Sequence, residues 1–135
     1  MGSVAIERGN FARGIAAFDA ARRLSTDVEA ANALAGRALA EARAHRLAEA
    51  RATLRLADSL ASTYLPTPLH TAVFIAQAYA ALRDVDRAVW WLARYPAQQD
   101  LHYQLHIACD PPFTMIANDQ RYRSLVIAQA RIGAC

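Results

Sequence analysis

The chain contains no lysine, so all fifteen of its basic residues are arginine. Glycine and proline are scarce, at five residues each, and β-branched residues are few. Alanine is very abundant, and this combination favours helix over strand. A length of 135 residues fits a single domain. A chain of this size buries roughly two thirds of its unfolded surface, which is enough for a hydrophobic core.

No run of about 18 apolar residues is present, which excludes a membrane-spanning helix. The N-terminus also lacks the charged-then-apolar layout of a signal peptide. Only two cysteines occur, Cys109 and Cys135. They could pair, but the last residue of a chain is usually frayed, and no disulfide framework is evident. We therefore expect a cytoplasmic protein with reduced thiols.

Motifs that carry chemistry are also missing. The sequence has no glycine-rich phosphate loop, no Gly-x-Ser-x-Gly and no Cys-x-x-Cys. Its acidic residues are scattered, so their spacing proposes no catalytic pair. We expect neither an enzyme nor a bound cofactor. The net charge of +3 is small and the arginines are spread out, which disfavours a nucleic-acid partner.

The clearest pattern that is present runs from Ile75 to Tyr95. Apolar residues spaced by three and four predict two amphipathic helices, joined by a charged turn at Arg83-Asp84-Val85-Asp86. Small residues at Ala76 and Ala88 would let the two backbones approach closely. A single hairpin of this kind cannot cover its apolar faces, so it must stack on similar hairpins.

This hairpin resembles a tetratricopeptide repeat. The matching residues are an aliphatic–small pair, a tyrosine, a turn, an alanine and a large apolar residue: Ile75, Ala76, Tyr79, Arg83-Asp84, Ala88 and Leu92. Two positions depart from the family pattern, because Arg83 replaces the turn glycine and Tyr95 fills the slot of a small residue. Equivalent small crossing residues at Gly14, Ala50 and Ala88 are spaced by 36 and 38 residues, near the family period of about 34.

The same spacing organises the rest of the chain. We predict helices from Phe11 to Arg23, from a capping box at Thr26–Glu29 to about Ala44, and from Leu47 to about Ser62. The second of these carries a narrow seam of small residues: Val28, Ala31, Ala35, Ala38 and Ala42. The chain thus divides into a partial first repeat, two further repeats and a C-terminal cap: residues 1–25, 26–63, 67–96 and 97–135.

The tail DPPFTMIANDQRYRSLV carries a second resemblance. It is similar to an ending found after helical repeats in bacterial multidomain proteins such as kinases, cyclases and winged-helix regulators. The matching residues are Asp110, Pro111, Phe113, Asp119, Tyr122 and Leu125. Such a tail closes the open end of a repeat array. Together the resemblances imply an all-α fold: a tetratricopeptide-like right-handed α-solenoid of helical hairpins with a C-terminal helical cap.

For function, the resemblance implies a protein-interaction or scaffold module, as part of a larger bacterial signalling or regulatory protein. Its partner would be a peptide or a protein held on the concave face, whose lining positions are Asn32, Leu39, Arg43, His70, Phe74 and Gln77. A carboxylate clamp of the family type is not expected, because lysine is absent. The open N-terminal end suits docking of a second copy or of another part of a parent chain.

Other residues leave alternatives open. His102, His106 and Cys109 share one helical face as His-x3-His-x2-Cys, so they could bind a metal or simply pack on the last repeat. An arginine run around a turn is either a solvated face or a surface for an acidic partner: Arg43, Arg46, Arg51 and Arg55. Trp90 is either an exposed interface anchor or packed under the cap.

Overall fold

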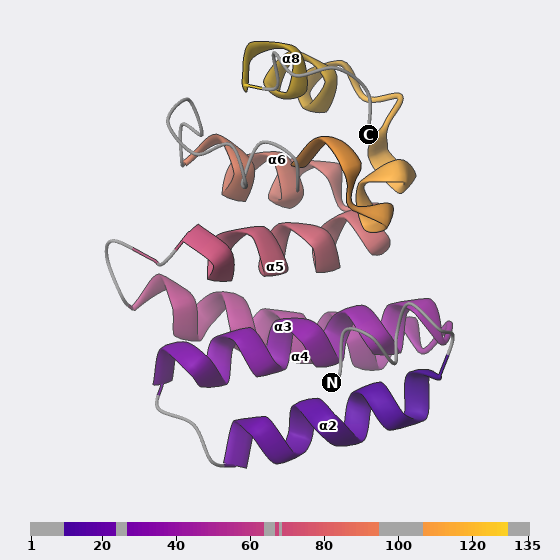
Figure 1. Ribbon diagram of the computed structural model, residues 1–135, viewed down its shortest axis with the longest axis vertical. Coiled ribbons are helices and arrows are strands. Elements are labelled where there is room, and N and C mark those ends of the chain that lie inside the picture. The colour runs from indigo at the N-terminus through magenta and orange to yellow at the C-terminus, as the bar shows by residue number, and fades with distance from the viewer. Residues whose placement is uncertain (1–9, 24–26, 64–66, 68, 95–106, 130–135) are drawn as a thin grey trace.

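The computed structural model contains helices joined by turns, and no strand, over the residues it describes, which are 10–23, 27–63, 67, 69–94 and 107–129. In chain order the elements are α2 (Phe11–Arg23), α3 (Asp27–Arg43), α4 (Leu47–Ser62), α5 (Leu69–Ala81), α6 (Val85–Ala93), the 3₁₀ helix η2 (Pro111–Ile116) and α8 (Gln120–Gln129). Along the long axis of the molecule, Figure 1 shows α2 at one end, then α3 with α4, then α5, α6 and finally α8, while η2 packs against α5. The predicted all-α class is confirmed for these residues. None of their helices combines the length and apolarity needed to cross a bilayer.

The helix ends follow the local sequence signals. Asp84 precedes α6, and its side chain accepts a hydrogen bond from the backbone N–H of Arg87 at 3.2 Å. Asp119 acts likewise before α8, accepting from the N–H of Arg121 at 2.8 Å. Both interactions satisfy N–H groups that have no partner inside their helix. Asp84 and Asp119 therefore act as N-caps of α6 and α8.

Small residues bring α3 into contact with three neighbours, α2, α4 and α5. In the predicted seam, Ala31, Ala35 and Ala38 have no exposed surface, and Ala42 is buried as well. The three crossing residues are buried too: Gly14, Ala50 and Ala88. Side chains of one carbon let helix backbones approach closely, so the alanine content specifies tight pairing as well as helix formation.

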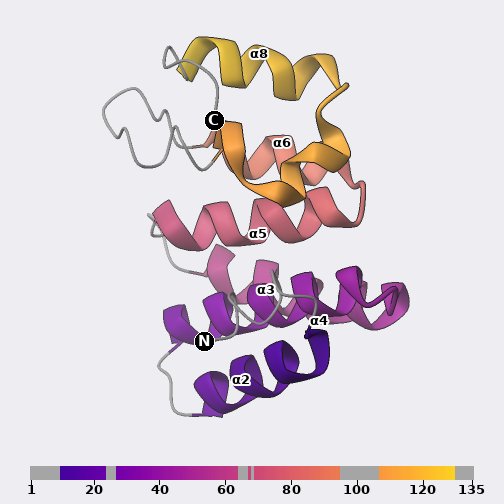
Figure 2. The same cartoon turned by 45° about the vertical axis from the view of Figure 1, so that its right-hand side comes forward.

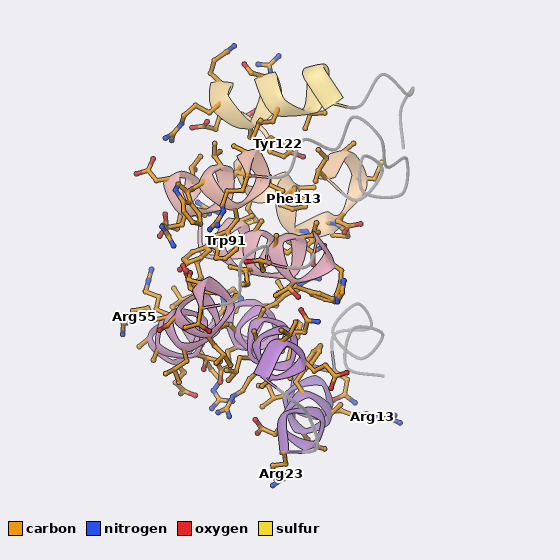
Figure 3. All side chains as sticks on the ribbon, turned by 90° about the vertical axis from the view of Figure 1, so that its left-hand side faces the viewer. Arg13, Arg23, Arg55, Trp91, Phe113 and Tyr122 are labelled. Carbon is orange, nitrogen blue, oxygen red and sulfur yellow. The ribbon has the colours of Figure 1, made fainter. Side chains whose placement is uncertain are left out.

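Large aromatic residues dominate the other end of the molecule. Trp91, Phe113 and Tyr122 belong to one buried cluster, and they follow one another between α5 and α8 in Figure 3. The Phe113 and Tyr122 rings stack with centroids 5.8 Å apart, and the Tyr122 hydroxyl donates to the Ile107 carbonyl at 2.5 Å. Figure 2 shows η2 lying between α5 and α8. Each large apolar side chain buried here contributes about 1.5–3 kcal/mol.

One detail of the predicted cap is different. Asp110 sits at the start of η2, where its side chain makes no capping hydrogen bond. It accepts instead from the Gln77 side chain of α5. The prolines at the first positions of η2 have no backbone N–H to donate, and the Asp110 carboxylate joins η2 to α5 through Gln77.

Candidate functional site

A cavity of about 590 Å³ lies among the ends of several elements whose ribbons are on the right of Figure 1. The start of α2, the α3–α4 turn, the α5–α6 turn and η2 meet there. We call it the edge cavity; its lining is Phe11, Ala42, Arg43, His45, Leu47, Arg51, Ala81, Leu82, Arg83, Pro111, Pro112, Thr114 and Met115. Its volume falls within the range of ligand sites in proteins.

The edge cavity is basic. Its lining includes Arg43, Arg51, Arg83 and His45, and no acidic residue. None of the three arginines forms an ion pair with a described residue. A guanidinium offers five N–H donors, so the arginines can hold carboxylate or phosphate oxygens.

Acidic residues close in sequence to the cavity are engaged elsewhere. Glu49 forms an ion pair with Arg46, outside the lining. Asp84 accepts the backbone hydrogen bond at the start of α6, and Asp110 accepts from Gln77. The positive charge of the lining is therefore not neutralised by a direct partner within the described residues.

Two basic residues in the lining occupy an unusual backbone conformation. His45 has φ of 62° and Arg83 has φ of 59°, and they are the only non-glycine residues with positive φ in the described part of the chain. For a residue with a side chain, this region costs about 1–2 kcal/mol. Glycine would remove that cost at both turns. A strained residue that also lines a cavity suggests that its side chain is used there.

Apolar side chains complete the lining. Leu82 and Pro112 are half-buried and buried, whereas Leu47 and Met115 remain 41% and 44% exposed. Among the described residues, four large apolar side chains are exposed, and these are two of them. The edge cavity can therefore take an apolar group with negative charge beside it.

The predicted concave-face residues do not gather in this cavity. Only Arg43 lines it. Leu39 and Gln77 are buried, and Gln77 binds Asp110. Phe74 is half-buried and His70 is exposed. Asn32 is half-buried, and its Oδ1 is buried without a described hydrogen-bond partner.

Sequence reasoning missed most of the lining. Leu47, Arg83 and Met115 come from three separate elements, and nothing in their local patterns suggests a shared site. One signal was available, since basic residues occupy both hairpin turns, at His45-Arg46 and at Arg83-Asp84. The structure brings residues of both turns, His45 and Arg83, to the same cavity.

Trp90 of α6 is 42% exposed. This agrees with the first of its two expected placements, an exposed side chain. Its ring lies edge-on to Trp91 with centroids 5.1 Å apart. The guanidinium carbons of Arg87 and Arg94 lie 4.6 and 4.4 Å from its centroid. These cation–π contacts fix the ring in place.

A second polar cluster joins α4, α5 and α6 around Asp58. Its Oδ2 accepts from the Tyr79 hydroxyl at 2.5 Å, from Arg87 Nη2 at 2.5 Å and from Trp91 Nε1 at 3.4 Å. Burial alone would raise the pKa of Asp58, but hydrogen bonds from Tyr79, Arg87 and Trp91 outweigh it and lower that pKa. Burial raises the pKa of Tyr79 to about 12, and the bond to Asp58 adds to the rise. Because Asp58 is only 8% exposed and accepts from three side chains, the cluster serves as a structural contact that joins α4 to α5 and α6.

The alternative metal site falls largely outside the described residues, where His102 and His106 lie. Cys109 is half-buried and disulfide-bonded, so its sulfur is not a free thiolate ligand in this structure. Among the described residues, no three His, Cys, Asp or Glu side chains are grouped to hold a metal ion. The expectation of reduced cysteines was wrong for Cys109. A short tail with few cysteines gives no framework pattern from which its pairing could be predicted.

Comparison with known proteins gives no family for this chain: no family model, no curated protein and no solved structure matches it significantly.

Proposed function

We propose that this chain is a tetratricopeptide-like helical repeat that acts as a non-enzymatic protein-interaction module. Its hairpins would be α3–α4 and α5–α6, with η2 and α8 as the closing cap. Contacts between α3 and α4, α5 and α6, and α3 and α5 support this arrangement. Ala50 and Ala88 have no exposed surface at matching places in the two hairpins, which supports it further.

The observation that carries the binding role is the edge cavity. Monomeric proteins seldom leave large apolar side chains exposed inside a concave site unless something covers them. Leu47 and Met115 are exposed in this cavity. We propose that a peptide segment of a partner protein docks here, at the hairpin turns, instead of on the expected concave face.

A peptide selection tests this role. Peptides displayed on phage would be selected against the whole chain, and the bound peptides would be measured by fluorescence anisotropy. We expect Leu47→Ser to weaken binding at least about tenfold, as loss of an anchor contact does. The matched control is Leu56→Ser, because Leu56 is also an exposed leucine of α4, at 58%, but lies outside the lining.

The expected result is that Leu56→Ser binds like the unmodified chain. Equal binding by both variants would contradict docking in the edge cavity. A selection that yields no binding peptide would contradict the module itself. Circular dichroism would confirm that both variants remain helical, which is expected because both leucines are exposed.

A further inference from the structure

The positive charge of the edge cavity indicates the chemical class of the peptide that it binds. We infer that its occupant is an acidic peptide segment, in which an apolar side chain enters the cavity and flanking carboxylates pair with Arg43, Arg51 and Arg83. This inference rests on the proposed function and specifies its partner. The cavity differs from the concave face, where the resemblance placed partner binding.

Charge complementarity is the first argument. Three arginines without a described ion-pair partner and one histidine face a lining that has no acidic residue. Like charges gathered around a cavity repel one another, and an acidic occupant relieves that repulsion. Arginine pairs with a carboxylate through two parallel hydrogen bonds, which orients the occupant as well as attracting it.

The position of the charges is the second argument. Arg43 comes from the end of α3, Arg51 from the first half of α4, and Arg83 from the α5–α6 turn. The exposed apolar residues Leu47 and Met115 belong to the same lining. Arginines on separate elements, with apolar side chains in the same lining, suit an extended peptide segment. Such a segment would carry several carboxylates and one apolar anchor residue.

Backbone strain is the third argument. The two positive-φ residues, His45 and Arg83, are both basic and both line this cavity. If these positions served only as turns, glycine would suit them better. Side chains with N–H donors at these two positions are accounted for if an anion accepts hydrogen bonds from them.

The remaining arginines argue against a nucleic acid. Arg13, Arg23 and Arg55 point outward in different directions in Figure 3, and the net charge is only +3. A phosphate backbone needs a continuous basic track, and its affinity depends steeply on salt. The concentration of positive charge at one apolar cavity favours a short acidic peptide.

Fluorescence anisotropy of labelled peptides tests the inference on the whole chain. The probe has one leucine flanked on both sides by glutamates, and two control peptides replace every glutamate by glutamine or the leucine by serine. We expect each control peptide to bind at least about tenfold more weakly than the probe, since several charge-assisted contacts or the anchor are lost.

Two protein variants locate the charge. Arg51→Gln should weaken the acidic probe about fivefold to tenfold, as expected for loss of one charge-assisted pair. Arg55→Gln is the matched control, because Arg55 is also exposed, lies one turn further along α4, and is outside the lining. It should change the affinity by less than about twofold, as for an unpaired surface charge.

Several outcomes would overturn the inference. Equal binding of the acidic and glutamine peptides, or equal effects of Arg51→Gln and Arg55→Gln, would contradict the role of charge. Displacement of the probe by an oligonucleotide that binds more tightly than the probe would assign the cavity to nucleic acid. If phage selection yields neutral peptides that depend on Leu47, the interaction module stands and only the acidic partner is wrong. If no peptide binds, the proposed function fails with it.

Discussion

Two buried carboxylates, Glu41 of α3 and Asp58 of α4, differ in how fully their hydrogen-bonding capacity is used. Glu41 has no exposed surface, accepts from Arg37 Nε at 2.8 Å, and leaves its Oε2 without a described partner. Asp58 receives three donors on Oδ2, and its Oδ1 accepts from the Ser62 hydroxyl at 3.3 Å. The interactions of a buried charge offset its desolvation cost only when its hydrogen-bonding atoms have partners. Asp58 therefore contributes more to stability than Glu41 does. The packing of α2 on α3 depends more on the shapes of the side chains in contact.

The sharpest test of this difference changes both carboxylates to amides. Asp58→Asn should lower the free energy of unfolding by about 2–4 kcal/mol, because it removes the charge that pairs with Arg87 and turns an amide donor toward other donors. Glu41→Gln should change it by less than about 1 kcal/mol, because Oε2 has no described partner to lose and Arg37 keeps its ion pair with Asp19.

Urea unfolding followed by circular dichroism measures both values. The comparison depends on the gap between the two variants and not on either value alone. If Glu41→Gln lowers the free energy of unfolding as much as Asp58→Asn does, the two carboxylates contribute equally to stability, and the contrast drawn between them is wrong.

Shape at the α2–α3 interface is tested at Gly36. A Cβ placed on Gly36 would overlap the Phe18 ring of α2. Gly36→Ala gains about 1 kcal/mol in helix propensity but loses about 1–3 kcal/mol by overpacking. We expect a net loss of up to about 2 kcal/mol in the free energy of unfolding, measured by urea unfolding.

A second substitution separates overlap from other causes. Combining Gly36→Ala with Phe18→Leu should give less than the sum of the two single losses, since the smaller side chain makes room for the new methyl group. Additive losses would show that the ring does not limit the approach of α2 to α3.

The sequence predicted much of the fold because its signals are local. Alanine content and spacing predicted α3 with its seam and α4 from Leu47 to Ser62, and these predictions are confirmed. The close approach of Phe18 to Gly36 was not predicted, because their contact depends on how α2 settles on α3. Neither amphipathic pattern contains that information.

The edge cavity could not be predicted from the sequence for the same reason. The sequence shows each of its basic residues, and Arg43 and Arg51 belong to the arginine run around the predicted turn. Their meeting with Arg83 and Met115 depends on contacts between elements that are far apart in the chain. Local patterns indicated a turn at His45 and at Arg83, but not that the two turns would face one cavity.

The smallest predicted effect concerns alkaline pH and again compares regions. Burial raises the pKa of both Tyr79 and Tyr122 to about 12, whereas a tyrosine in the unfolded chain ionises near 10. Above about pH 10 the unfolded chain loses these protons while the folded chain keeps them, so stability is full below that pH and falls as pH rises toward about 12. Tyr79→Phe should cost about 1 kcal/mol at neutral pH, through the lost bond to Asp58, yet show a shallower decline in this range. Urea unfolding at a series of alkaline pH values measures the slope, with Tyr122→Phe as the comparison at the cap. An equally steep decline in Tyr79→Phe and in the unmodified chain would show that the Asp58 cluster does not hold the Tyr79 proton.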